Sequence, residues 1–260
     1  MLRFFALLFL VSISQNSLAY ESSLRSAVRE PGVSYTQYLD RARYVIQQGG
    51  DAYLTPVDSA KKFKQAKLPK TVEWGSPDLL TQIFEKVRDN RWLIEPDRPG
   101  FLRRPSWMYP DDGCYARAAL VNHLLIRWNI PAAGKIFAFG DLTSKNSNTK
   151  TGYVSWWYHV APIVEVAGQK YVLDPSVESH HPLTLREWLN LISENPEEVE
   201  ISICGSGAYS PYDKCERESD GEEALALKEQ KAFLRMEWFR LEELHRNPVQ
   251  ELGDNPPWKH

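Results

Sequence analysis

The chain has 260 residues, of which 43% are hydrophobic and 25% charged, as in an ordinary globular protein with one sizeable core. Its formal net charge of -3 argues against a general nucleic-acid binder, because such proteins carry a strong basic excess. We therefore expect no nucleic acid among its partners.

The N-terminus predicts a secretory signal peptide over residues 1–19. Arg3 supplies the positive start, residues 4–13 form a short apolar run, and residues 17–19 carry the small side chains of a cleavage site. The run is too short to span a membrane, and no later stretch is long and apolar enough to do so. Cleavage near Ala19 predicts a secreted or periplasmic protein, and the alternative is an uncleaved anchor.

Residues 20–72 form an N-terminal extension, and we expect the main domain to cover residues 73–260. The extension holds one predicted helix, Tyr35 to Gln48, which stops at a Gly-Gly pair. The basic stretch Lys61 to Lys70 (KKFKQAKLPK) near its end has two interpretations. It is either a solvated helix end or linker, or the junction of a pro-segment that is removed.

The remaining chain alternates predicted helices and strands. Helical spacing marks Pro77 to Trp92, an Ala- and Leu-rich run from Cys114 to Trp128, Thr184 to Ile192, and Ser219 to Arg246. Residues 93–112 hold four prolines and are expected to form an extended loop. Strands are predicted over Lys135 to Phe139, Trp156 to Val166 and Lys170 to Leu173, the last two joined by a turn at Ala167-Gly168.

The three cysteines are informative if the protein is exported. An odd number in an oxidising compartment predicts one disulfide and one free thiol. Cys204 and Cys215 enclose a short loop rich in Gly, Ser, Pro and Tyr, so their pairing is easy. Cys114 is then the free thiol.

Cys114 stands at the start of a predicted helix, directly after Asp111, Asp112 and Gly113. Unpaired N–H groups at a helix start lower the pKa of a thiol, which favours the nucleophilic thiolate, and can bind an oxyanion. The competing interpretation is a small buried apolar residue without chemistry. Capping of the helix is the expected task of the two aspartates, ahead of substrate contact.

His159 and Asp174 lie on the two strands of the predicted hairpin. A tight turn at Ala167-Gly168 places Asp174 opposite Ala161, so the two side chains share one face as diagonal neighbours. At that separation a carboxylate can hydrogen-bond an imidazole and fix its tautomer. Taken singly, each residue also has a purely structural interpretation: His159 as a half-buried histidine, and Asp174 as part of a turn-forming Asp-Pro pair. Together with Cys114 they fit a nucleophile, a base and a residue that orients the base.

Three segments, DDGCYARA (111–118), WWYHVAPIV (156–164) and YVLDPS (171–176), resemble the bacterial protein-glutaminase family. The resemblance implies an α+β fold with a papain- and transglutaminase-like core. In such a core the nucleophilic Cys lies at a helix N-terminus packed on an antiparallel sheet that carries His and Asp. It also implies a catalytic triad of Cys114, His159 and Asp174, and a pro-segment that is removed from the secreted precursor.

The activity that the resemblance implies is hydrolysis of the side-chain amide of protein- or peptide-bound glutamine, giving glutamate and ammonia through a Cys thioester. Two alternatives remain open from the residues. One is a transglutaminase or cysteine peptidase with the same triad, since a triad does not encode the acceptor. The other is a catalytically inactive secreted binding module. We expect a monomer whose partners are protein or peptide substrates.

Five aromatic residues near the triad are candidates for the substrate groove: Trp107, Tyr109, Trp156, Trp157 and Tyr158. For each of them the core is the competing location. His123, His180 and His181 show no metal-ligand spacing, so we expect neither a metal nor another cofactor.

Overall fold

The computed structural model describes residues 25–50, 53–95, 97–218 and 222–260, and the fold is built around one six-stranded antiparallel sheet. The strand order is β1-β8-β4-β5-β6-β7. These strands are β1 (Lys61–Lys62), β4 (Gly134–Lys145), β5 (Tyr153–Val166), β6 (Gln169–Val172), β7 (Leu183–Thr184) and β8 (Glu200–Cys204). A separate pair, β2 (Leu93–Ile94) and β3 (Leu102–Arg103), forms a small second sheet.

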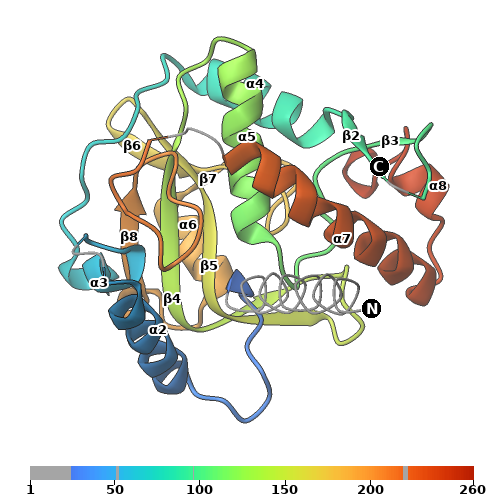
Figure 1. Cartoon of the computed structure of the whole chain (residues 1–260). Helices are drawn as coiled ribbons and strands as arrows, with labels where there is room; N and C mark the ends of the chain where they lie inside the picture. The colour runs from blue at the N-terminus through green and yellow to red at the C-terminus, as the bar shows by residue number, and fades with distance from the viewer. Residues whose placement is uncertain (1–24, 51–52, 96, 219–221) are drawn as a thin grey trace, which may run out of the picture.

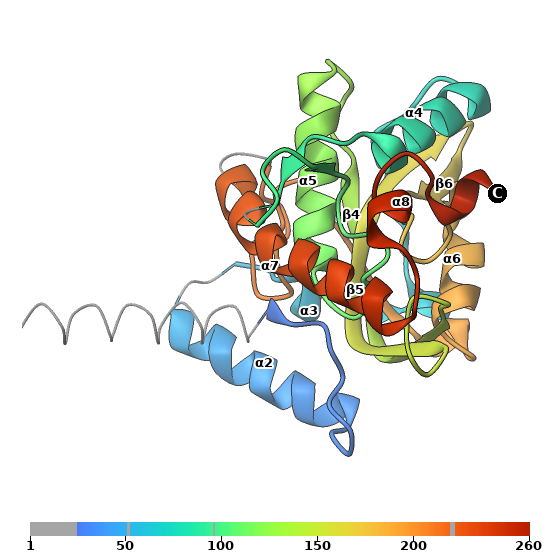
Figure 2. The same cartoon turned by 90° about the vertical axis from the view of Figure 1, so that its right-hand side faces the viewer.

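Helices cover both sides of the central strands. They are α2 (Tyr35–Gly49), α3 (Pro56–Ser59), α4 (Pro77–Asp89), α5 (Cys114–Arg127), α6 (Leu185–Ile192), α7 (Glu222–Glu243) and α8 (Pro248–Glu251), with short 3-10 turns η1 (Phe63–Gln65), η2 (Pro196–Glu198) and η3 (Pro257–Lys259). Figures 1 and 2 show α5 and α7 on one side of β4 and β5, and α6 on the other. The expected α+β fold, with Cys114 at a helix N-terminus packed on an antiparallel sheet, is confirmed.

The predicted hairpin is present with the expected register. Val166 pairs with Gln169, and Ala167 and Gly168 have φ values of 52° and 78°. Two consecutive positive φ angles are typical of the two-residue turn that matches the twist of antiparallel strands. The register that was counted from this turn therefore holds along β6, which ends at Val172.

Helix α5 is buried along most of its length, as its Ala- and Leu-rich sequence predicts. Leu120, Val121 and Leu125 are fully buried, and α5 packs on β5 on one side and on α7 on the other. A helix that is apolar on nearly every side can only be stable inside a core. This burial fixes the position of its first residue, Cys114.

Two stretches differ from the sequence-based expectations. Residues 93–112 are not simply an extended loop, because β2 and β3 pair within them. The basic stretch from Lys61 is neither a helix end nor a free linker at its start, because Lys61 pairs with Ile201 at the edge of the main sheet. The 2-residue length of these strands explains why no periodic pattern predicted them. The predicted signal peptide and the predicted helix start at Ser219 lie outside the described residues.

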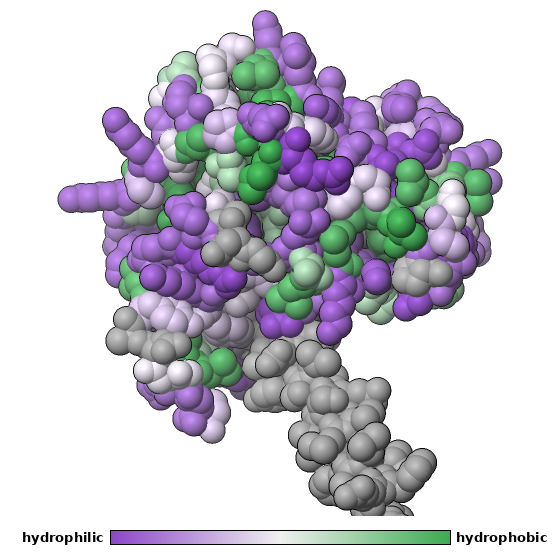
Figure 3. Space-filling model, turned by 45° about the horizontal axis from the view of Figure 1, so that its top comes forward, coloured by the Kyte–Doolittle hydropathy of each residue, from purple (hydrophilic) through white to green (hydrophobic). Residues whose placement is uncertain are grey.

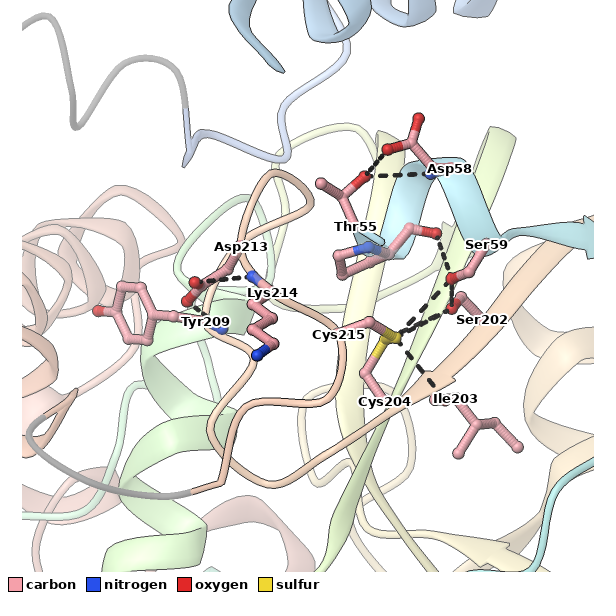
Figure 4. The surroundings of a disulfide bond; sticks show 11 residues. Thr55, Asp58, Ser59, Ser202, Ile203, Cys204, Tyr209, Asp213, Lys214 and Cys215 are labelled. Atoms are coloured by element: carbon pink, nitrogen blue, oxygen red, sulfur yellow. Dashed lines mark hydrogen bonds between the residues drawn. A yellow bond between two sulfur atoms is a disulfide. The ribbon is translucent and has the colours of Figure 1, made fainter. Parts of the chain in front are cut away.

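The predicted disulfide is present between Cys204 and Cys215 (Figure 4). It joins the end of β8 to the loop that follows, and the Cys215 N–H donates to the Leu54 carbonyl at 2.9 Å. The loop is thereby held both to the sheet and to the segment before α3. Cys114 is free, as expected.

Among the described residues, no helix is both long enough and apolar enough to cross a lipid bilayer. On the face shown in Figure 3 hydrophilic side chains predominate, and the hydrophobic ones form separate groups. The three candidate triad residues are all buried.

Candidate active site

Cys114 is the first residue of α5, and the backbone before it adopts a conformation that suits glycine. Gly113 is the N-cap with φ 79° and ψ 12°, and no side chain caps the helix. A Cβ on Gly113 would lie 2.6 Å from the Phe233 ring on α7. The expectation that Asp111 or Asp112 caps α5 is therefore wrong, because the chain enters the helix through a left-handed glycine.

His159 lies in the buried part of β5 and is oriented by Asp174. The His159 Nε2 and Asp174 Oδ2 atoms are 2.7 Å apart. The other ring nitrogen, Nδ1, is buried and has no hydrogen-bond partner within the described chain. The Trp156 ring stacks on the imidazole with a centroid distance of 4.3 Å. The imidazole is therefore fixed in orientation, with one nitrogen left for a further partner.

Asp174 follows β6 and accepts hydrogen bonds on both carboxylate oxygens. Oδ1 accepts from the Ser176 hydroxyl at 2.5 Å and the Ser176 N–H at 3.2 Å, while Oδ2 accepts from His159 and from the Trp188 indole N–H at 3.0 Å. Burial by itself would raise the pKa of this carboxyl. The His159 charge and the hydrogen bonds from His159, Ser176 and Trp188 outweigh burial and lower the pKa to about 2.

The Cys114 thiol lies against β5 at Val160, the residue that follows His159 in the chain. A hydrogen bond from the backbone of Val160 reaches the sulfur, and the charge of Asp174 is close enough to act on it. Burial raises the pKa of the Cys114 thiol to about 12, although Arg117 and the Val160 hydrogen bond act in the opposite direction. We expected the helix start to lower the pKa of the Cys114 thiol. In the buried site the loss of hydration outweighs that effect.

The loop before Cys114 is held by charged side chains that are themselves buried. Arg117 donates through Nη1 to the Asp112 carbonyl at 2.6 Å and to the Tyr109 carbonyl at 3.1 Å. The Glu237 carboxylate on α7 accepts from the Met108 N–H at 2.7 Å. The loop cannot shift without breaking bonds to buried charges, so the start of α5 is rigidly placed.

Residues 25–29 cover this site by pairing with the edge of β5. Ala27 is fully buried; its N–H donates to Asp112 Oδ1 at 3.0 Å, and its carbonyl accepts from the Trp157 N–H at 3.1 Å. Asp112 is two residues before Cys114, and Trp157 is two residues before His159. The Arg29 N–H continues the pairing to the Ser155 carbonyl. The segment therefore bridges the two elements that carry the thiol and the imidazole.

The five aromatic candidates are distributed around the site in different ways. Trp156 stacks on His159, Trp157 donates its indole N–H to the Ser26 carbonyl, and Tyr158 donates its hydroxyl to the Arg25 carbonyl. Trp107 is buried and lines a cavity of about 220 Å³ that also touches Pro175 and Ser176. Tyr109 stacks on Phe233 beside the start of α5. Three of the five are thus in contact with the covering segment: Trp157 and Tyr158 through these hydrogen bonds, and Trp156 through a backbone bridge to Val28.

No cluster of three or more candidate metal ligands occurs among the described residues. His123 pairs with Glu223 and packs on Trp92 away from the candidate triad. The neighbouring His180 and His181 are exposed.

The site thus combines a buried thiol at a helix start, which accepts a hydrogen bond from the Val160 backbone, with the hydrogen-bonded pair His159 and Asp174. Residues 80–192 match the family model described as Glutaminase, and this stretch contains Cys114, His159 and Asp174. The match confirms the resemblance to the protein-glutaminase family that the sequence segments indicated. No curated protein matches the chain.

Solved structures of protein-glutaminases are distantly similar. A crystal structure of pro-protein-glutaminase is 22% identical over 66% of this chain and 64% of that one, with a TM-score of 0.46. A crystal structure of a mutant pro-protein-glutaminase is 24% identical over 59% and 57%, with a TM-score of 0.42. The NMR structure of protein-glutaminase from Chryseobacterium proteolyticum is 20% identical over 71% and 92%, with a TM-score of 0.43. The chain thus spans less than two thirds of the two pro-protein-glutaminase chains.

Sequence reasoning missed three contributors to the site. Ser176 had a signal, because a Ser two residues after an Asp commonly closes a turn with it. Trp188 had none that separated it from the other eight tryptophans. The covering role of residues 25–29 also had no local signal, since it depends on pairing with a strand more than a hundred residues away.

Proposed function

We propose that the chain is a thiol hydrolase that converts protein- or peptide-bound glutamine to glutamate and ammonia, with Cys114, His159 and Asp174 as its triad. The observation that carries the proposal is the buried, disulfide-free Cys114 against β5 beside a His159–Asp174 hydrogen bond, within the stretch that matches glutaminases. Water is the acceptor of the acyl group, and neither metal nor cofactor takes part.

The mechanism follows from the hydrogen-bond pattern. An ionised Asp174 requires the proton of neutral His159 to be on Nε2, which leaves Nδ1 as the base for the thiol. The thiolate attacks the side-chain carbonyl carbon of glutamine, and the backbone N–H of Cys114 at the helix start stabilises the oxyanion. His159 then protonates the departing ammonia. A water molecule activated by His159 hydrolyses the thioester and frees the thiol.

In the same proposal residues 1–19 are a signal peptide, the N-terminal extension (20–72) contains a pro-segment, and residues 73–260 form the catalytic domain of a secreted or periplasmic monomer. Support for a pro-segment comes from residues 25–29, which bridge the Cys114 and His159 elements. Because β1 is paired with β8 in the main sheet, we place the removed part before residue 53. Gly49 and Gly50 are exposed at the end of α2 and offer an accessible cleavage region.

The groove that the removed segment leaves would bind the substrate. We propose that Trp156, Trp157 and Tyr158 line it from β5, and that Trp107 and Tyr109 line it from the side of α5. The contacts of Trp157 and Tyr158 with residues 25 and 26 support this assignment.

The decisive experiment compares the intact chain with one cut after α2 through a specific protease site inserted at Gly50. The cut protein, freed of its N-terminal peptide, is expected to release ammonia from a glutamine-rich protein, with the small mass gain of amide-to-acid conversion. A Cys114→Ser variant cut in the same way is the control and should release none. Cross-linked or fragmented substrate would instead indicate a transglutaminase or a peptidase.

If the cut wild type and the cut Cys114→Ser variant release the same amount of ammonia and both bind a protein partner, the result supports an inactive binding module and refutes the hydrolase. Full activity of the uncut chain would leave the hydrolase in place and refute the pro-segment. The two parts of the proposal are therefore tested separately.

A further inference from the structure

Trp188 contacts both members of the His159–Asp174 pair. Its indole N–H donates to Asp174 Oδ2 at 3.0 Å, the same oxygen that is 2.7 Å from His159 Nε2. Its ring also stacks on the imidazole, with a centroid distance of 5.7 Å and an interplanar angle of 25°. Trp188 is fully buried, so water does not compete for either contact.

The local fold explains why Trp188 reaches this place. β7 pairs with β6, with Val172 opposite Leu183, so the chain after β7 starts beside the end of β6. Thr184 closes a capping box with Glu187, which starts α6 at that point. Trp188 is therefore in the first turns of a firmly capped helix, next to Asp174, which lies two residues beyond β6.

The donor type matters chemically. An indole N–H only donates, and it neither gains nor loses a proton in the ordinary pH range. With Trp188 on Oδ2 and Ser176 on Oδ1, the carboxylate is held as an acceptor on both oxygens. The nitrogen of His159 that faces Oδ2 must then carry its proton, and the basic site of the neutral ring is Nδ1.

We propose that Trp188 is a positioning residue that fixes the Asp174 carboxylate and, through it, the Nε2–H tautomer of His159. This inference rests on the proposed thiol hydrolase function for its kinetic consequence, but the tautomer itself is independent of that function. Without the indole donor, Oδ2 keeps only the imidazole and Ser176 alone holds Oδ1, so the carboxylate is held less firmly and His159 is expected to populate both tautomers.

The test replaces Trp188 by Phe, which keeps an aromatic ring and removes the N–H. The matched control is Trp74→Phe, because Trp74 is also buried and donates its N–H at 3.4 Å to the Pro131 carbonyl, away from the triad. In the cut protein we expect Trp188→Phe to lower kcat about 10- to 100-fold, as for loss of a hydrogen bond to a charged group, with little change in KM. The acid limb of the pH–rate profile should move to higher pH, because the Asp174 carboxylate loses a hydrogen bond that lowers its pKa. Trp74→Phe should change neither kcat, nor KM, nor the pH profile.

A second readout does not depend on activity. Imidazole ¹⁵N NMR of the intact chain is expected to show a single Nε2–H tautomer for His159 in wild type and in Trp74→Phe, and a mixture in Trp188→Phe. Should Trp188→Phe fold poorly, benzothienylalanine at the same position keeps the indole shape without an N–H, and the same two readouts apply.

The possible results separate the inference from the proposed function. Trp188→Phe that matches Trp74→Phe in tautomer, kcat and pH profile overturns the positioning role, even when wild type deamidates protein. A tautomer mixture in Trp188→Phe supports the role, even when wild type proves to have no glutaminase activity. A uniform loss of activity in both tryptophan variants, with His159 unchanged, points to packing alone and also overturns it.

Discussion

His159 and Asp174 are 15 residues apart in the chain and are joined by a 2.7 Å contact between Nε2 and Oδ2. The Asp174 carboxylate accepts its remaining hydrogen bonds from Ser176 and Trp188, whereas His159 Nδ1 has no partner among the described residues. Both carboxylate oxygens thus have hydrogen-bond partners, whereas one imidazole nitrogen can still accept a proton. This asymmetry gives the direction in which a proton would move from a thiol, and it leads to the following predictions.

Asp174→Asn should lower kcat by about 10³- to 10⁴-fold, because an amide can present its NH₂ to Nε2 and reverse the tautomer of His159. The measurement is ammonia release by the cut protein at saturating substrate. Asp89→Asn is a matched control, since Asp89 also accepts an indole N–H, from Trp258, but at the surface of α4. A rate for Asp174→Asn within a few-fold of the control would exclude Asp174 from the triad.

Acid should remove the contribution that the ionised Asp174 carboxylate makes to the free energy of unfolding. The folded pKa of Asp174, about 2, lies below the unfolded value near 4, so the carboxylate stabilises the fold above pH ~4 and this contribution is lost as the pH falls toward 2. Its size is on the order of 2–3 kcal/mol for a depression of about two pH units. Urea unfolding at several pH values should show a gap between wild type and Asp174→Asn that narrows over this range. A gap independent of pH would contradict the assignment.

Gly113→Ala should destabilise the fold and displace the nucleophile. The left-handed backbone costs a non-glycine residue about 1–2 kcal/mol, and the new Cβ would also meet the Phe233 ring at 2.6 Å. Gly152→Ala is the control, because Gly152 has nearly the same φ, 78°, and nothing within 4 Å of the added Cβ. Urea unfolding should therefore show a larger loss for Gly113→Ala, part of which Phe233→Ala restores. Equal losses in the two glycine variants would rule out the steric part of the argument.

The pKa of the Cys114 thiol should fall when residues 25–29 are removed. In the covered state burial raises this pKa to about 12, so thiolate forms only in strong alkali. After cleavage and removal of the segment, hydration returns, and the helix start and Arg117 favour the charged form. Thiolate absorbance against pH, with Cys114→Ser as the blank, should show titration below the ordinary thiol value near 8.5. An unchanged alkaline titration would mean that the segment does not control the nucleophile.

Local patterns were sufficient for the elements that bury a long periodic face or carry a strong turn signal. Helix α4 begins at Pro77 after the Ser76 cap, and the β5–β6 hairpin has the register that the Ala167-Gly168 turn dictates. The short strands β1, β2, β3 and β7 were not predicted. Each has only 2 residues, and their pairing depends on neighbours that are distant in sequence or on loop geometry rather than on periodicity.

The sequence by itself determined the free thiol at the start of a buried helix, the pairing of Cys204 with Cys215, and a shared face for His159 and Asp174. These depend on residue type, helix periodicity and hairpin register, all of which act over short distances along the chain. Only the tertiary structure decided that Gly113 rather than an aspartate begins α5, that Trp188 completes the surroundings of Asp174, and that Ala27 joins the Asp112 and Trp157 sides of the site. The physical reason is that burial and hydrogen bonds between distant segments exist only once the core has formed, and here they also raise the thiol pKa that the helix start alone would lower.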